Sequence, residues 1–356
     1  MMKNGLLVIL SLILTLGAGE GALRLLGFRG EISWNLQDVI SIDDTVLNFR
    51  LSPNSESFSG NIVYKLNSRG FRDLEHSYQK VANAFRILVL GDSVAFGYKV
   101  SLENTFSRKL EGLLRGRTAD RTVEIVTLAM PGLNTLQEAH ILWEEGQRYT
   151  PDMILILYSI NDAETGVAFA RQETTCRIEL LKLPIPCASK SALKNSALLF
   201  FVKDRMDQVF WKLNIGDQDD VFGSLRSDYF AQLYTAEEKW RTNVLAGFNS
   251  IAKYAQERQI PVILAVSPIM FEFDHYQWTW IHEKLLREGR GRGFQVIDLL
   301  DRYRKYSVKD IRVERGDFVH PGELGHEVAA VTVGEMILQA PNLLETQRPA
   351  SLTPQF

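Results

Sequence analysis

Short apolar runs alternate with amphipathic stretches along the chain from residue 85 to residue 340. Each apolar run is rich in β-branched residues and is closed by a turn signal, as expected for a buried strand. The predicted strands cover residues 85–91, 123–129, 152–158, 261–267 and 294–298. Apolar residues recur at helical spacing between them, which predicts helices over residues 103–114, 135–149, 236–259, 276–289 and 323–338. Strands that alternate with helices indicate an α/β fold with a doubly wound, mostly parallel sheet of about five strands.

The segments outside this alternation suggest further parts of the chain. Residues 29–84 contain turn signals with little periodicity, so we expect a preamble of short strands and loops that packs on the core of residues 85–340. The alternation breaks over residues 163–235, where no clear strand is visible and apolar residues follow helical spacing. This helical insertion is placed to act as a lid, although ordinary packing also explains its apolar stripe. Residues 341–356 are polar and Pro-containing, which predicts a flexible tail.

The N-terminal segment, residues 1–28, is of a different kind. Residues 5–19 carry no charge and are mostly apolar, and Glu20 ends the run. A helix that spans a membrane needs about 20 apolar residues, so this run alone is short. Three interpretations stay open: a retained anchor over residues 5–28 with Arg24 at the interface, a cleaved signal segment, or a buried helix. The first two place the globular part outside the cytoplasm.

Composition excludes several classes of function. The chain has 356 residues, 46% of them apolar, and a formal charge of −3, so it can bury a large core and has no electrostatic attraction to nucleic acid. It shows no zinc-type Cys/His spacing and no Gly-rich phosphate loop, so neither a metal nor a nucleotide cofactor is expected. The two cysteines, Cys176 and Cys187, form a disulfide if this part is exported. The alternative is two free thiols.

The first predicted strand ends in Gly91-Asp92-Ser93. Ligands of open α/β sheets bind at the carboxyl ends of the strands, so Ser93 is a candidate nucleophile. The same three residue types are common in ordinary turns, so the triplet does not decide the matter alone. A nucleophilic serine also needs a base that accepts its proton and a group that orients this base.

His320 is the best candidate for that base among the six histidines. It lies in an irregular stretch after the fifth predicted strand, and Asp317, three residues ahead, can accept a hydrogen bond from its imidazole. The other histidines are less suitable. His140 and His326 lie inside predicted helices, and the remaining three lie in polar or aromatic surroundings with no obvious carboxylate arrangement: His76, His275 and His282. A surface-loop histidine is the alternative interpretation of His320.

Two further strand ends offer donors for an oxyanion, which acyl transfer requires. The backbone N–H of Gly132 follows the second predicted strand, and the side-chain amide of Asn161 follows the third. An ordinary turn explains Gly132 equally well, and a turn or helix cap explains Asn161.

Together these motifs resemble the SGNH, or GDSL-type, hydrolase family over residues 85–340. They occur in the family's order at successive strand ends: Gly91-Asp92-Ser93, Gly132, Asn161-Asp162 and Asp317 with His320. Residues 67–73, Asn-Ser-Arg-Gly-Phe-Arg-Asp, are similar to a segment found ahead of this strand in membrane-anchored bacterial members. Two positions depart from the family pattern, because Val94 replaces a leucine and Ser159 a glycine.

The resemblance implies a role for each of these residues. Ser93 would be the nucleophile, His320 the general base and acid, and Asp317 the residue that orients His320. The implied oxyanion hole consists of the N–H groups of Ser93 and Gly132 and the amide of Asn161. Asp92 and Asp162 would support these loops, and the fold would be flavodoxin-like.

The implied function is a serine ester hydrolase that acts on an acyl ester, either a lipid or an acylated glycan, at the cell envelope. A single N-terminal helix would hold the protein in the bacterial inner membrane with its catalytic domain extracytoplasmic. The alternative is a secreted or periplasmic protein after signal cleavage. An envelope polysaccharide O-acyltransferase would use the same site. A non-catalytic glycan- or partner-binding protein could also keep the fold, because fold alone does not establish function. The oligomeric state is left open.

Overall fold

The structure is a computed structural model, which describes residues 2–28, 39–41, 46–47, 49–59, 61–115, 117, 121–164, 175–178, 183–186, 195–212, 229–314 and 316–344. The chain divides into two compact units. The first comprises Met1–Ile40, Ser55–Lys65 and Phe169–Asp217, and the second comprises Ser41–Asn54, Leu66–Ala168 and Gln218–Phe356.

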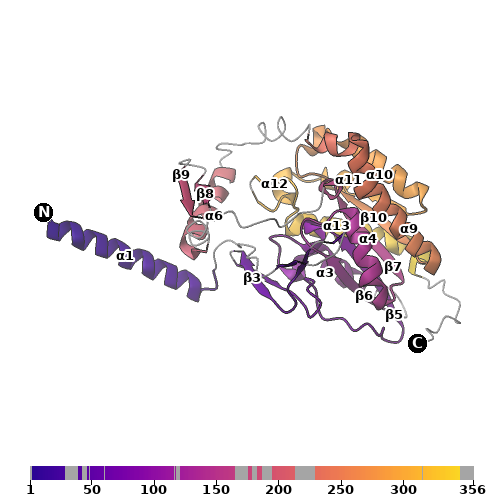
Figure 1. Cartoon of the computed structure of the whole chain (residues 1–356), viewed down its shortest axis with the longest axis horizontal. Helices are drawn as coiled ribbons and strands as arrows, with labels where there is room; N and C mark the ends of the chain where they lie inside the picture. Colours follow the sequence, from indigo (N-terminus) through magenta and orange to yellow (C-terminus); the bar gives the residue numbers. More distant parts are fainter. Residues whose placement is uncertain are drawn as a thin grey trace. The chain divides into compact units, whose positions relative to one another are not determined.

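A parallel sheet of five strands forms the core of the second unit (Figure 1). Its order is β11 (Gln295–Asp298), β10 (Val262–Ser267), β7 (Met153–Ser159), β5 (Ala84–Gly91) and β6 (Thr122–Ala129). All four pairings are parallel. The predicted α/β fold with a five-stranded parallel sheet is therefore confirmed. This strand order places the topological switch point between β5 and β7, where ligands bind in such sheets.

The central strands are apolar because both of their faces are covered. Every residue of β7 is buried, and Ile87, Leu88 and Val89 of β5 are fully buried. Arg86 is the exception at the start of β5, where its guanidinium contacts Glu124 and the carbonyl groups of Tyr78 and Tyr149. These contacts provide hydrogen-bond partners for a buried guanidinium near the amino end of β5, whereas Ser93 follows the carboxyl end of this strand.

Helices connect and cover the strands of this unit. Those near the candidate motifs are α2 (Ser93–Phe96), η2 (Leu102–Asn104), α3 (Phe106–Leu114), α4 (Thr135–Glu144), η3 (Gly146–Tyr149) and η4 (Ile160–Ala163). The later ones are α8 (Glu237–Lys239), the π-helix η5 (Trp240–Leu245), α9 (Ala246–Arg258), η6 (Phe273–His275), α10 (Thr279–Gly291), α11 (Leu300–Tyr303), α12 (Val308–Ile311), α13 (Glu323–Gln339) and η7 (Pro341–Leu344). α3 packs against α13, and α4 packs against α9.

Sequence signals explain where these helices begin and approach one another. Asn134 begins α4 with a capping box, in which its side chain accepts from the Gln137 N–H and the Gln137 side chain accepts from the Asn134 N–H. Gly247 lets α9 approach α4 closely, because a Cβ at this position would lie 2.5 Å from the carbonyl group of Thr135.

The first unit contains short strands and two long helices. Its elements are α1 (Met2–Leu25), β3 (Glu56–Ser59), β4 (Ile62–Lys65), β8 (Thr175–Ile178), β9 (Leu183–Pro186) and α6 (Ala197–Lys212). β3 pairs with β4 and β8 with β9, both antiparallel. The short strands β1 (Val39–Ser41) and β2 (Phe49–Leu51) complete the preamble.

The β8–β9 pair corrects the prediction that residues 163–235 contain no clear strand. Pro184 and Pro186 weaken the strand signal of β9, because proline has no N–H to donate. They lie two residues apart, so both missing donors fall on the same side of β9. A two-stranded pair needs hydrogen bonds along only one side of each strand, and it therefore tolerates both prolines.

Glu20 fixes α6 against α1 within the first unit. Its carboxylate accepts hydrogen bonds from the Ser196 hydroxyl (2.9 Å) and the N–H groups of Ala197 (3.0 Å) and Leu198 (2.8 Å). Burial raises the pKa of Glu20, but these N–H donors outweigh it and lower the pKa to about 2. A residue of one helix thus caps the first turn of another.

In the part of the chain that the structure describes, no helix has the length and apolar character needed to cross a membrane. The prediction of a spanning anchor over residues 5–28 is therefore not supported. The last two turns of α1 contain Glu20 and Arg24, which pair with each other over 2.7 Å.

Two other predictions fall outside the described residues. Cys187 is not among them, and only the backbone of Cys176 is described, so the Cys176–Cys187 disulfide stays a prediction. For the tail predicted over residues 341–356, the structure describes only residues 341–344, which form η7, so its flexibility stays a prediction.

Candidate active site

Ser93 is the first residue of α2, immediately beyond the carboxyl end of β5. Asp92 caps this helix, because its Oδ1 accepts the N–H of Val94 over 2.8 Å. Gly91 permits the tight turn, since a Cβ there would lie 2.6 Å from the Cβ of Ala95 and 2.8 Å from the carbonyl oxygen of Leu157. The Gly-Asp-Ser triplet thus forms a strand-to-helix turn, and it leaves the Ser93 side chain beside His320.

The structure brings Ser93, His320 and Asp317 into one hydrogen-bonded chain. Ser93 Oγ lies 2.8 Å from His320 Nε2, and His320 Nδ1 lies 2.9 and 2.8 Å from the two carboxylate oxygens of Asp317. An ionised carboxylate only accepts hydrogen bonds, so Nδ1 carries a proton and Nε2 is left to accept one. Asp317 also accepts the N–H groups of Val319 and His320, which fixes the carboxylate itself.

Electrostatics prepare this pair for proton transfer. Burial lowers the pKa of His320, but the Asp317 carboxylate outweighs it and raises this pKa above its ordinary value of 6.5. Burial likewise raises the pKa of Asp317, but the attraction of His320 outweighs it, and the pKa lies below 3.8. The imidazolium that would form after proton transfer is therefore stabilised by its partner.

The loop that carries His320 is held by main-chain hydrogen bonds. Val313 donates to the His320 carbonyl group over 3.0 Å, and Met270 donates to the Phe318 carbonyl group over 2.7 Å. The ring of Tyr98 packs against the imidazole with a centroid distance of 4.6 Å. Tyr98 follows α2, so this contact joins the serine and histidine segments.

Asn161 lies in η4, the turn after β7, and its amide group is fixed at both ends. Its Nδ2 donates to Asp92 Oδ2 over 2.7 Å, and its Oδ1 accepts the Ser159 hydroxyl over 2.6 Å. The amide nitrogen carries a second N–H, which is the candidate donor to an oxyanion. Ser159 therefore orients the amide at a position where the family pattern has glycine.

Asp162 and Gly132 occupy the neighbouring loops. Asp162 Oδ2 accepts the N–H of Ser159 over 2.8 Å and so closes the turn that carries Asn161. Gly132 adopts a left-handed φ of 79°, three residues beyond Ala129. Ala129 pairs in register with Gly91, so the Gly132 loop leaves the sheet at the same edge as Ser93. Direct hydrogen bonds thus join the serine, histidine and asparagine loops, and the sheet register adds the glycine loop.

Sequence reasoning missed a buried acid beside this site. Glu138 of α4 is fully buried, and within the described part of the chain neither of its carboxylate oxygens has a hydrogen-bond partner. Burial and the charge of Asp92 raise its pKa well above 4.5. The pKa of Asp162 is also raised, by burial and then by Asp92 and Glu138. Glu138 lies one turn before the apolar residues Ile141 and Leu142, a sequence signal for its burial.

The structure also corrects one statement about the other histidines. His76 has a carboxylate partner, because its Nε2 lies 3.3 Å from Asp73 Oδ2. His282 also has one, because its Nδ1 lies 2.8 Å from Asp298 Oδ1, and its Nε2 lies 3.0 Å from the Tyr276 hydroxyl. His282 and Asp298 are 16 residues apart, and the packing of α10 beside β11 brings them together. This second pair is fully buried at His282 and contains no serine.

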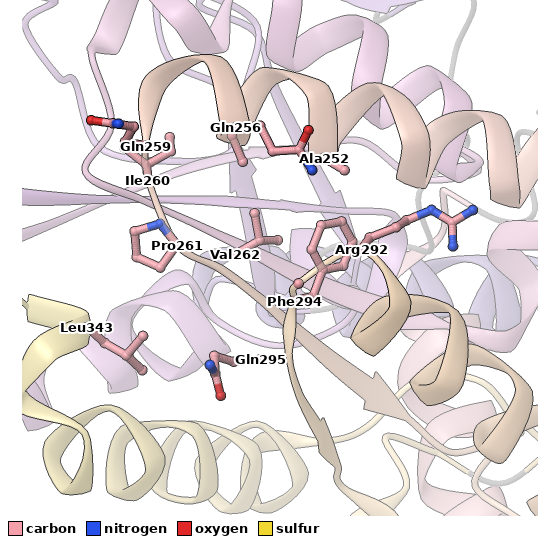
Figure 2. Close-up of a pocket in the computed structure, with 12 residues that line it drawn as sticks. Ala252, Gln256, Gln259, Ile260, Pro261, Val262, Arg292, Phe294, Gln295 and Leu343 are labelled. Carbon is pink, nitrogen blue, oxygen red and sulfur yellow. The ribbon is translucent and has the colours of Figure 1, made fainter. Parts of the chain in front are cut away.

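A cavity of about 660 Å³ lies away from this constellation (Figure 2). Its walls include Val262 and Gln295, the first residues of β10 and β11, together with Arg292, Phe294 and Leu343. The amino ends of parallel strands lie at the edge opposite their carboxyl ends, so this cavity is remote from Ser93. Among the described residues, no group of three His, Cys, Asp or Glu side chains could hold a metal ion.

Comparisons with known proteins add the following findings. Residues 89–328, more than half of the chain, match the model of the GDSL-like lipase/acylhydrolase family. No curated protein sequence matches the chain.

The solved structures that are similar include a lipase/acylhydrolase from Enterococcus faecalis, with 15% identity over 74% of this chain and 100% of that chain and a TM-score of 0.41. They also include an inhibited psychrotrophic esterase from Pseudoalteromonas sp., with 12% identity over 72% of this chain and 98% of that one and a TM-score of 0.40. A mutant acetyl-xylooligosaccharide esterase from Geobacillus has 13% identity over 73% of this chain and 96% of that one, with a TM-score of 0.42.

The match to the family model begins within β5 and ends within α13, so it spans the sheet and every residue of the Ser93, Asn161 and His320 loops. The chain therefore belongs to the GDSL-like lipase/acylhydrolase family.

Proposed function

We propose that this protein is a serine ester hydrolase that works through an acyl-enzyme on Ser93. The observation that carries the proposal is the hydrogen-bonded chain from Ser93 Oγ through His320 to Asp317, with contacts of 2.8 and 2.8–2.9 Å. These distances match the geometry that activates a serine nucleophile. Membership of an acylhydrolase family supports ester bonds as the target.

The first half of the reaction transfers the acyl group to the enzyme. Ser93 Oγ attacks the ester carbonyl carbon while His320 Nε2 accepts the hydroxyl proton, and the carbonyl oxygen becomes an oxyanion. The Asn161 amide, with the N–H groups of Gly132 and Ser93, would donate to this oxyanion. When the intermediate collapses, the bond to the alcohol breaks, and His320 returns its proton to the departing alcohol oxygen.

The second half releases the acid. A water molecule gives one proton to His320 Nε2 and attacks the acyl carbon, so a second oxyanion forms at the same donors. The bond to Ser93 Oγ then breaks, and His320 returns the proton to the serine. Asp317 holds the imidazole in the required orientation through both halves.

The substrate class within this proposal is an acyl ester of a lipid or of an acylated glycan. A series of chromogenic esters of increasing acyl length, assayed with and without sugar acceptors, tests it. Free acid as the product in both conditions supports the hydrolase. A sugar ester that forms only with an acceptor indicates acyl transfer instead. Glycan binding without turnover would indicate a binding protein.

Labelling with a serine-reactive phosphonate tests the chemical step separately from the substrate. The phosphonyl group should be found by mass spectrometry on the peptide that contains Ser93, and Ser93→Ala should abolish the label. Ser267→Ala, at another strand end, is the matched control and should label normally. A label on another residue, or none, would contradict the proposed nucleophile.

The proposal extends to the location of the protein, which we place outside the cytoplasm. It is supported by the uncharged residues 5–19 and by the exposed side chains of Leu12 and Leu16 in α1, which are 59% and 50% exposed. Protease added to intact spheroplasts should digest the protein, and protection would contradict this location. Determination of the N-terminal residue of the mature protein then distinguishes two cases. A retained segment begins near Met1, and a cleaved signal leaves an N-terminus near residue 20.

A further inference from the structure

The turn at residues 67–73 has no role in the mechanism above, yet specific hydrogen bonds and a required glycine fix its conformation. Asn67 Oδ1 accepts the N–H groups of Arg69 (3.0 Å) and Phe71 (3.1 Å). Gly70 has a φ of 81°, and a Cβ there would lie 2.4 Å from the carbonyl oxygen of Leu51, so only glycine fits. The turn places Arg72 in the interior, where this residue is only 3% exposed.

Arg72 binds the segment that follows the nucleophile helix. Its Nη1 donates to the carbonyl oxygens of Phe96 (3.0 Å) and Gly97 (2.5 Å), and its Nη2 donates to that of Val100 (2.6 Å). The carbonyl groups at the end of a helix have no partner within the helix. The forked guanidinium can satisfy several of them at once, which a lysine ammonium cannot do with the same geometry.

This contact matters because α2 has only four residues, Ser93–Phe96. So short a helix has little stability of its own, since nucleation costs more than one turn recovers. Asp92 holds its first turn and Arg72 holds its end, so the position of Ser93 depends on both.

Asp73, the next residue, holds the strand β6 in a similar way. Its Oδ2 accepts the N–H of Thr127 over 2.7 Å, and its Oδ1 pairs with Arg108 over 3.2 Å. Thr127 lies on β6, an edge strand of the sheet, shortly before the Gly132 loop. Two consecutive residues of the turn therefore contact the segments that carry the nucleophile and a candidate oxyanion donor.

We propose that Arg72 is a positioning residue for catalysis, which acts by holding α2 so that Ser93 Oγ stays aligned with His320 Nε2. This inference rests on the proposed serine mechanism. Ser93 Oγ has two acceptors within reach, His320 at 2.8 Å and Asp92 Oδ2 at 3.1 Å, and its single proton can go to only one of them. A small displacement of α2 shifts that balance toward Asp92, and a misplacement of about 1 Å costs roughly 10²-fold in rate.

The test compares Arg72→Lys with Arg86→Lys in the full chain. Arg86 is a fair control because it is also buried (1% exposed) and also donates to carbonyl groups, in its case the two of Tyr78 and Tyr149. It lies at the opposite edge of the sheet, far from Ser93. Both variants should lower the unfolding temperature. Only Arg72→Lys should lower kcat and the rate of Ser93 phosphonylation, by about 10²-fold, with KM within about twofold of wild type.

Sucrose separates a positioning defect from partial unfolding, because it favours the compact state without touching the site. If Arg72 positions Ser93, kcat of Arg72→Lys stays low when sucrose restores the unfolding temperature. Recovery of kcat in sucrose, or an equal loss of kcat in Arg86→Lys, would overturn the inference. Wild-type protein that fails to label at Ser93 would instead refute the proposed mechanism, so the two failures are distinguishable.

Discussion

Asn161 donates its side-chain amide to Asp92 Oδ2 over 2.7 Å, and this bond joins the turn after β7 to the cap of the nucleophile helix. One N–H of the amide is used to fix its position, and the other is the candidate donor to the oxyanion. An oxyanion donor of this kind acts only in the transition state. Its loss should therefore change kcat and leave substrate binding largely intact.

Asn161→Ala should lower kcat by about 10²–10³ while KM changes little. Asn243→Ala is the matched control, because Asn243 anchors the same loop through the carbonyl groups of Ala163 and Glu164 but has no place in the mechanism. Steady-state kinetics on one ester decide the matter. A mutant that only raises KM would move Asn161 from oxyanion stabilisation to substrate binding.

Ser159→Gly restores the residue of the family pattern and should nevertheless slow the enzyme. The change removes the hydroxyl that donates to Asn161 Oδ1 over 2.6 Å, so only the hydrogen bond to Asp92 still orients the amide. A hydrogen bond of this kind contributes about 1 kcal/mol, so kcat should fall roughly fivefold. In the double mutant with Asn161→Ala the effect should vanish. A persistent fivefold loss there would show that Ser159 acts independently of Asn161.

The fold could be predicted from the sequence where local pattern and final environment agree. β5, β7 and β10 are buried on both faces and are apolar for that reason, so their positions were predicted to within a few residues. β8 and β9 were missed because Pro184 and Pro186 are compatible with a strand only in a pair that is open on one side.

The contacts of the site are likewise of two kinds, those within one short segment and those between distant segments. Asp317 and His320 lie three residues apart, so their contact follows from local geometry. The pair of His282 and Asp298 and the ring contact of Tyr98 with His320 join distant segments, and only the folded chain creates them. The residue type alone also does not show how its surroundings shift the pKa of an acid. For this reason the sequence makes Glu138 look like an ordinary helix residue.

Ser93 and His320 should act as one catalytic unit. Ser93→Ala, His320→Ala and the double mutant should lose similar activity, because each change disables the same step. His282→Ala breaks a second His–Asp pair of the fold and controls for the structural effect of losing a buried histidine. It should lower stability while kcat of the folded protein survives. Additive losses in the double mutant, or an active Ser93→Ala, would refute the triad.

The pH dependence should report His320, whose neutral form accepts the serine proton. Asp317 raises the pKa of His320 above 6.5, so the acid limb of kcat/KM should have its midpoint above that value. Asp317→Asn removes the attraction, so the limb should move to lower pH while kcat falls. An unchanged midpoint in Asp317→Asn would show that another group controls the limb.

The pKa shifts of His320 and Asp317 also make the free energy of unfolding depend on pH. A histidine whose pKa is raised by folding contributes stability that is complete below pH 6.5 and is lost as the pH rises through its folded-state pKa. For Asp317 the sign is opposite, because its stabilising contribution is present above pH 3.8 and is lost as the pH falls through its lowered pKa. Denaturant unfolding of wild type and Asp317→Asn should therefore differ most between these two limits.

Glu138 offers a prediction in which a polar substitution increases stability. Burial and the charge of Asp92 raise the pKa of Glu138 well above 4.5, so the folded state binds this proton more tightly than the unfolded chain does. Wild type therefore loses stability as the pH rises from 4.5 through the folded-state pKa of Glu138. Glu138→Gln keeps the shape and hydrogen-bonding capacity of the protonated acid but does not titrate.

The free energy of unfolding of Glu138→Gln, relative to wild type, should therefore increase as the pH rises from about 4.5 through the folded-state pKa of Glu138. Urea unfolding at several pH values measures it. Glu323→Gln, at the first turn of α13, serves as the control for replacing an acid elsewhere, and the increase should be larger in Glu138→Gln. If the two variants follow the same pH dependence, Glu138 is ionised in the folded protein, and Asp92 then has a buried charge beside it that the nucleophile helix must tolerate.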